Sequence, residues 1–206
     1  MVPNKFFSRT NMKLTTLKTT ENKEIDGPLL ITPNIFEDSR GFFYESWNKE
    51  EFFKLTNIKV DFVQDNHSKS SNGVLRGLHY QLRPYPQAKL IRCIEGDIFD
   101  VVVDLRIKSK TFGKWSSAVL SQQNHNELWV PEGFAHGFLT TSDYAEVIYK
   151  TTNYWAKEFE RSILWNDREI TIKWPMESLD SKYPKLSIKD KNASTLQEAI
   201  SKSEVF

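Results

Sequence analysis

Short runs of β-branched and aromatic residues, separated by Gly, Pro, Asn and Asp, follow one another from residue 27 to residue 174. Runs of this length bounded by turn-forming residues are typical of an all-β sandwich or barrel. So many short runs do not fit the alternation of strands and helices found in α/β proteins. The pattern predicts strands over residues 29–31, 41–46, 60–66, 74–81, 89–94, 97–105, 115–120, 126–130, 135–140, 145–152 and 170–173.

The clearest alternation lies in residues 97–105, where every second residue from Phe99 to Leu105 is apolar. Side chains two apart on a strand share a face, so this set is expected to face a core. Gly96 immediately precedes this run and follows the apolar run 89–94. A glycine at such a short connection predicts a tight hairpin between the two strands.

Helices are predicted only where the strand pattern stops. The stretch 48–56 predicts a short helix with Asn48 as its N-cap, because an Asn side chain accepts hydrogen bonds from the free amides of the first turn. A second helix is expected in residues 192–202, with Ser194 and Gln197 as a weak capping box. The last 30 residues are rich in Lys, Ser, Asp and Pro and are expected to wrap over the barrel.

The chain of 206 residues is long enough for one domain with a sizeable core. We predict that this domain spans residues 25–206. Residues 1–24 carry charges but no continuous apolar stretch, which argues against a signal peptide. They are predicted to be a leader that is poorly ordered or associated with a dimer.

Charge and cysteine content narrow the partners and the compartment. Lys and Arg number 28 against 27 Asp and Glu, so the chain lacks the basic field that nucleic-acid binders use. No run of 18 apolar residues exists, so no membrane span is predicted. Cys93 is the only cysteine, so no internal disulfide can form, and a cytoplasmic location is predicted. We expect this thiol to be a buried apolar group.

Two histidine-containing motifs stand about 50 residues apart, "GVLRGLHYQ" at 73–81 and "VPEGFAHGF" at 130–138. In this order in an all-β chain, they resemble the paired motifs of the cupin superfamily. That resemblance implies a jelly-roll β-barrel or sandwich, here with short C-terminal helices, whose cavity holds both histidines. Each histidine alone would more often be a hydrogen-bonded structural residue.

Many cupins bind a metal ion, but the residue pattern here does not favour one. Gln81 stands where a second histidine ligand is expected, and Lys89 would repel a cation. The sequence therefore predicts a cavity without a metal that carries out proton transfer on an anionic or carbonyl substrate. Two alternatives stay open. One is a metal-dependent cupin oxygenase or isomerase, which elemental analysis would detect, and the other is a non-catalytic sugar-binding cupin.

Six ordered segments carry a closer resemblance: "DSRGFFYES", "VQDNHSKSSNGVLRGLHYQ", "QAKLIRCIEGDIFDVVVDLR", "LWVPEGFAHGF", "YKTTNYW" and "SILWND". Together they resemble the dTDP-4-dehydrorhamnose 3,5-epimerase family over residues 28–190. The resemblance implies epimerisation of dTDP-4-dehydro-6-deoxy-D-glucose at C3 and C5, without a cofactor, in a homodimer. Closely related enzymes invert one carbon only, and the same acid and base serve both outcomes, so single epimerisation stays open.

The resemblance also implies residue roles. His79 is expected to be the general base, Asp190 its carboxylate partner, Tyr149 the acid on the opposite face, and Lys89 the cation near the C4 oxygen. An imidazole titrates near neutral pH, which suits a general base. Further substrate contacts are expected from Arg40, Glu45, Gln64, Asn66, Arg76, His136, Glu160 and Lys189.

Arg76 and His79 pose a geometric problem, because they are three residues apart and would point to opposite faces of a regular strand. If both contact one ligand, the strand must bend or bulge between them. Gly77 is the residue that allows such a distortion.

Overall fold

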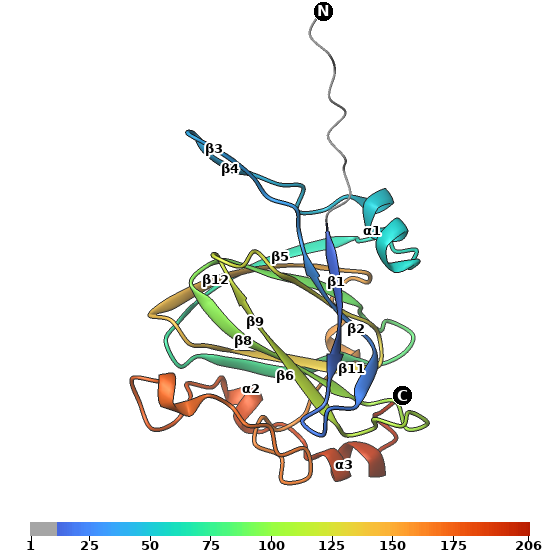
Figure 1. Ribbon diagram of the computed structural model, residues 1–206. Coiled ribbons are helices and arrows are strands. Elements are labelled where there is room, and N and C mark those ends of the chain that lie inside the picture. The colour runs from blue at the N-terminus through green and yellow to red at the C-terminus, as the bar shows by residue number, and fades with distance from the viewer. Residues whose placement is uncertain (1–11) are drawn as a thin grey trace, which may run out of the picture.

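Two antiparallel sheets carry most of the chain in the computed structural model, which describes residues 12–206 (Figure 1). The first sheet has the order β1 (Lys13–Lys18), β2 (Glu24–Thr32), β10 (Glu127–Val130), β7 (Lys89–Glu95), β12 (Tyr144–Thr151), β5 (Gln64–Ser71). The second has the order β13 (Glu160–Ser162), β6 (Leu75–Gln81), β11 (Phe134–Thr140), β8 (Asp97–Asp104), β9 (Trp115–Ser121). A separate hairpin joins β3 (Phe36–Asp38) and β4 (Gly41–Phe43).

Within residues 12–206 the helices are few and short. They are α1 (Lys49–Thr56), α2 (Ile188–Lys191), α3 (Leu196–Ser201) and the 3₁₀ turns η1 (Lys157–Phe159) and η2 (Met176–Ser178). The predicted all-β class with short C-terminal helices is therefore confirmed.

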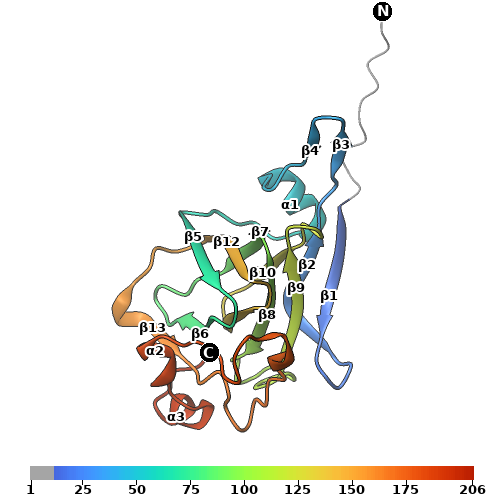
Figure 2. The ribbon, with the colours of Figure 1, turned by 90° about the vertical axis from the view of Figure 1, so that its left-hand side faces the viewer.

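Three apolar clusters hold the layers together. The central cluster lies between the sheets and combines Ile91 and Leu128 of the first with Val102 and Phe138 of the second. The C-terminal segment covers the outer face of the second sheet, as predicted, and Leu196 of α3 is buried there (Figures 1 and 2). Helix α1 covers part of the outer face of the first sheet.

The alternation predicted in β8 is confirmed, because Val101, Val103 and Leu105 pack under the C-terminal segment. The tight turn at Gly96 also forms, but the predicted hairpin was wrong. Strand β7 pairs with β10 and β12, whereas β8 pairs with β9 and β11 in the other sheet. Gly96 has φ 72°, and a Cβ there would lie 2.0 Å from the carbonyl oxygen of Tyr144. This turn therefore carries the chain from one sheet to the other.

The predicted strand 170–173 was wrong. Thr171 has φ 54°, which lies outside the extended region, and the side chain of Asp167 accepts hydrogen bonds from the amides of Glu169 and Ile170. Ile170 is nevertheless buried against the second sheet. The apolar residues of this segment thus pack from a turn rather than from a strand.

The two helix caps had different outcomes. Asn48 caps α1 as predicted, accepting from the amides of the first turn. The capping box of α3 is formed by Thr195 and Glu198, not by Ser194 and Gln197. The backbone of Ser194 pairs beside the end of β13 instead, so the helix begins one residue later.

The predicted leader is structured in part. Residues 13–18 form β1, which pairs along β2, so the expectation of poor order was wrong for this stretch. Residues 1–11 lie outside the described residues. Within residues 12–206, every helix is too short or too polar to cross a membrane.

Candidate active site

A cavity of about 910 Å³ is lined by strands of both sheets and by the C-terminal segment 185–190. All the predicted site residues line it except Arg40 and Glu45. Those in the cavity are Gln64, Asn66, Arg76, His79, Lys89, His136, Tyr149, Glu160, Lys189 and Asp190.

Strand β6 distorts at Gly77, as predicted. Arg76 pairs with Phe138 and His79 with His136, so the register shifts between them and both side chains reach the cavity. Gly77 has φ 129°, and a Cβ there would lie 2.6 Å from the Cα of Gly137. The peptide bond between Gly77 and Leu78 is cis. Only glycine allows this backbone shape together with so close an approach of the two strands.

His79 is bonded to Asp190 through Nε2, at 2.5 Å from Oδ1. The other carboxylate oxygen of Asp190 accepts from the hydroxyl of Ser187, at 2.8 Å. A carboxylate can only accept, so Nε2 of His79 donates and Nδ1 carries the free lone pair. The contact joins β6 to α2 across 111 residues of sequence.

Burial and the hydrogen bond between the two side chains set the charge states of this pair. Burial lowers the pKa of His79, and the nearby cations Lys189 and Lys89 also lower it, against the opposing effect of Asp190. Burial would raise the pKa of Asp190, but the hydrogen bond from His79 holds it below its usual range. The pair therefore consists of a neutral imidazole and a carboxylate at neutral pH.

Lys89 lies deep in the cavity, with 9% of its surface exposed. Burial lowers the pKa of its ammonium to about 8, while the charges of Asp100 and Glu160 act to raise it. Its Nζ donates a long hydrogen bond to the carbonyl oxygen of His79, at 3.5 Å. The ammonium is thus largely available to a guest.

Tyr149 lies on β12, in the opposite sheet to His79. Its side chain lines the same cavity. Burial raises the pKa of its phenol, which is therefore protonated at neutral pH, and the charge of Arg76 acts to lower that pKa. The cavity thus combines a neutral base on one sheet with a neutral acid on the other.

The other cavity residues are held by polar contacts. His136 is bonded through Nε2 to Oδ1 of Asp100, at 2.8 Å, and both side chains are buried. Lys189 forms an ion pair with Glu160, at 2.9 Å. The amide of Gln64 donates to Asn66, at 2.9 Å, which orients both amides along β5. These contacts fix several donors and acceptors before any ligand binds.

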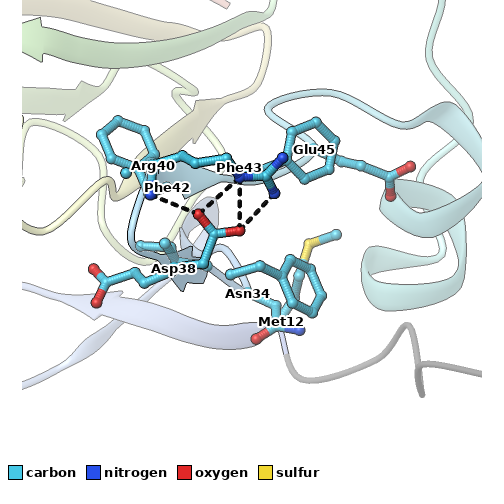
Figure 3. A pocket seen from close by; sticks show the side chains of 11 residues that line it. Met12, Asn34, Asp38, Arg40, Phe42, Phe43 and Glu45 are labelled. Atoms are coloured by element: carbon cyan, nitrogen blue, oxygen red, sulfur yellow. Dashed lines mark hydrogen bonds and ion pairs between the residues drawn. The ribbon is translucent and has the colours of Figure 1, made fainter. Parts of the chain in front are cut away.

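Arg40 and Glu45 lie elsewhere in the chain and do not line this cavity. They belong to the β3–β4 hairpin and its continuation, which project away from the two sheets (Figures 1 and 2). Both line a separate pocket beside this hairpin (Figure 3). There the guanidinium of Arg40 is paired with Asp38 and its side chain is 88% exposed.

A family model described as dTDP-4-dehydrorhamnose 3,5-epimerase matches residues 22–198. The chain belongs to the dTDP-4-dehydrorhamnose 3,5-epimerase family. The resemblance, the cupin-type jelly roll and the enzyme class, an isomerase, are thereby confirmed.

Three relatives of this epimerase illustrate the range of the family. The dTDP-4-dehydrorhamnose 3,5-epimerase of Shigella flexneri is 53% identical over 176 residues, which are 85% of this chain and 94% of the relative. The dTDP-6-deoxy-D-glucose-3,5-epimerase of Legionella pneumophila, solved with dTDP-4-keto-L-rhamnose, is 43% identical with TM-score 0.81, covering 90% of this chain and 94% of that one. A 3'-monoepimerase of Streptomyces bikiniensis, solved with dTDP-quinovose, is 33% identical with TM-score 0.81, covering 88% and 89%.

Trp155 and Lys185 are among the cavity residues of this epimerase that were not predicted as site residues from the sequence. Trp155 lines the cavity and is 55% exposed, and its backbone amide donates to Gln64. Lys185 lines the cavity from the C-terminal segment. The motif "YKTTNYW" already contained Trp155, but nothing in the local sequence of Lys185 distinguishes it from neighbouring surface lysines.

Proposed function

We propose that the chain converts dTDP-4-dehydro-6-deoxy-D-glucose to dTDP-4-dehydro-L-rhamnose, with His79 as base and Tyr149 as acid. The observation that carries this assignment is the presence of both side chains, from opposite sheets, in one cavity with the ammonium of Lys89. The hydrogens on C3 and C5 are acidic only because each carbon adjoins the C4 ketone. A base, a cation for the enolate oxygen and an acid on the opposite face therefore suffice for inversion.

In the first half-reaction, Nδ1 of His79 takes the proton from carbon while the C4 oxygen becomes an enolate. Asp190 stabilises the imidazolium that forms, through its hydrogen bond to Nε2. The ammonium of Lys89 stabilises the enolate oxygen, a role that contributes about 3–4 kcal/mol per donor in other enzymes.

In the second half-reaction, Tyr149 donates its proton to the opposite face of the same carbon. The phenolate left behind is stabilised by the positive charge of Arg76, which already acts to lower the pKa of this phenol. Proton exchange with solvent then returns the base and the acid to their starting states. The same pair can act at the second carbon after the sugar turns within the cavity.

We assign the nucleotide to the open part of the cavity. Arg76 suits the diphosphate, because a guanidinium fits phosphate oxygens well. Gln64 and Asn66 offer amides for hydrogen bonds, and the exposed indole of Trp155 offers a flat face on which a thymine can stack. His136, Glu160 and Lys189 complete the proposed substrate contacts.

Arg40 and Glu45 fit this function if the protein is a homodimer in which each β3–β4 hairpin reaches the partner's cavity. The hairpin presents exposed aromatic rings, with Phe42 59% and Phe43 67% exposed, as expected of a surface that a second copy covers. Mixing the inactive variants Arg40→Ala and His79→Ala should restore activity, since a mixed dimer then contains one intact site. No recovery after subunit exchange would contradict a shared site.

The central test is proton NMR of the substrate in heavy water. His79→Ala should abolish deuterium incorporation at both C3 and C5. Tyr149→Phe should retain exchange but lose the inverted product, because abstraction needs only the base. His67→Ala serves as the matched control, since this exposed histidine lies outside the cavity and is bonded to Glu146. Undiminished exchange in His79→Ala would rule out this assignment of the base.

A second candidate function is epimerisation of one carbon only, which the similarity to the Streptomyces bikiniensis monoepimerase favours. Deuterium at C3 alone would identify it. In either case we propose that no cofactor takes part, because side chains supply the base, the acid and the cation. We also propose a cytoplasmic location, with which the single cysteine, Cys93, is consistent.

A further inference from the structure

The cations that line the cavity differ in how their charge is compensated. Lys189 is paired with Glu160. Lys89 lies deep in the cavity, at the place proposed for the sugar ketone. Arg76 and Lys185 both line the cavity, and within residues 12–206 neither is hydrogen-bonded to a carboxylate. Besides Lys89, the cavity therefore has two cations, Arg76 and Lys185, that can neutralise an anionic guest.

The backbone of Lys185 is fixed beside the start of β6. Its amide donates to the carbonyl of Gly73, at 2.7 Å, and its carbonyl accepts from the amide of Leu75, at 3.0 Å. This parallel bridge pairs Lys185 with Val74, two residues before Arg76. The C-terminal segment thus brings a lysine to the site of the arginine proposed for the diphosphate.

The two cationic groups also bind neighbouring residues at the end of β5. Nε of Arg76 donates to the hydroxyl of Ser70, at 3.0 Å. Nζ of Lys185 donates to the carbonyl of Asn72, at 2.9 Å, and more weakly to the hydroxyl of Ser71, at 3.4 Å. All these acceptors are neutral, so the positive charges of both groups are concentrated at one edge of the cavity.

We propose that Lys185 is a second phosphate-binding residue, which acts with Arg76 on the diphosphate of the nucleotide sugar. The inference rests on the proposed function, because it takes the ligand to be a dTDP-sugar. A diphosphate carries negative charge on both phosphates, and a single guanidinium leaves part of it uncompensated. The ammonium of Lys185 supplies the remaining positive charge as a flexible point charge.

Lys185 could instead serve only to tie the C-terminal segment to the turn at Asn72. The two roles differ in their dependence on phosphate. Loss of a purely structural contact should lower the affinity for every ligand of the cavity alike, whereas loss of a phosphate contact should lower it only for ligands that carry phosphate. The phosphate contact should also be weakened by salt, since it is an interaction between exposed charges.

The test is calorimetric titration of thymidine and of dTDP into the full chain and the variant Lys185→Gln. The affinity for dTDP should fall roughly threefold to tenfold, the range for a partly exposed charge contact, while that for thymidine stays the same. The loss should shrink at high salt, and Lys185→Arg should restore binding. In steady-state assays the effect should appear in KM rather than in kcat.

Lys182→Gln is the matched control, because Lys182 is exposed on the same segment, contacts the ring of Tyr183 and does not line the cavity. An equal loss of thymidine and dTDP affinity in Lys185→Gln would show that the lysine is only a tie. Unchanged dTDP affinity in that variant would also overturn the proposal, provided that Arg76→Gln weakens dTDP. Failure of the wild-type chain to bind dTDP at all would instead refute the proposed function.

Discussion

The buried ammonium of Lys89 should make the protein less stable while making it active. In the folded chain burial lowers its pKa from 10.5 to about 8. A fall of about 2.5, at about 1.4 kcal/mol for each pKa unit, corresponds to roughly 3 kcal/mol of unfolding free energy lost at neutral pH. Lys89→Met removes the charge but keeps a long, flexible side chain that can fill the same space.

The cost of burying the Lys89 ammonium depends on pH. Below pH 8 the ammonium is charged in both states, so the full cost of burying it is present. Between pH 8 and 10.5 the unfolded chain holds a proton that the folded chain has released, and the unfolding free energy therefore rises with pH. The advantage of Lys89→Met should be about 3 kcal/mol at pH 7 and should shrink steadily above pH 8.

Urea denaturation of both proteins between pH 7 and pH 10 measures this difference, with the exposed-site variant Lys108→Met as a control that should show no such trend. The same Lys89→Met protein should lose kcat by about 10²–10³-fold, the usual effect of removing an oxyanion donor. A variant that is less stable than the wild type, or whose stability difference stays constant with pH, would refute the reasoning.

Three further predictions concern other buried positions. Gly77→Ala should lower the unfolding free energy by about 2–6 kcal/mol in chemical denaturation, because strain at positive φ adds to the clash with Gly137. Gly41 has φ 124° and open space around it, so Gly41→Ala should lose only the part that comes from backbone strain. Equal losses of unfolding free energy in the two variants would contradict this. Burial raises the pKa of Glu127 from 4.5 to about 8, so the unfolding free energy of the wild type should fall as pH rises between these values. Glu127→Gln should abolish this pH dependence. Parallel pH profiles of the two proteins would disprove this prediction. Asp190→Asn should lower kcat far more than it changes KM, because a neutral amide cannot stabilise the imidazolium of His79. A change in KM alone would argue that Asp190 has only a structural role.

Local sequence determined the class of the fold and the distortion of β6. Alternation in residues 97–105 predicted a strand because side-chain direction on a strand depends only on position along it. Gly77 predicted the bulge for a similarly local reason, since Arg76 and His79 cannot share a face of a regular strand. The resemblance, carried by short ordered motifs, gave the expected roles of His79, Tyr149 and Asp190.

Tertiary structure alone decided which distant segments meet. The glycine at the short connection predicted a hairpin between β7 and β8, but the two strands pair in different sheets. Residues on both faces of β8 are buried, and such a strand gives no sign of the sheet in which it pairs. The lowered pKa of Lys89 depends on burial by strands of both sheets, and the charge beside Arg76 depends on a lysine that the C-terminal segment brings back. Burial, sheet pairing and electrostatic fields sum over the whole fold, so a single segment of sequence does not contain them.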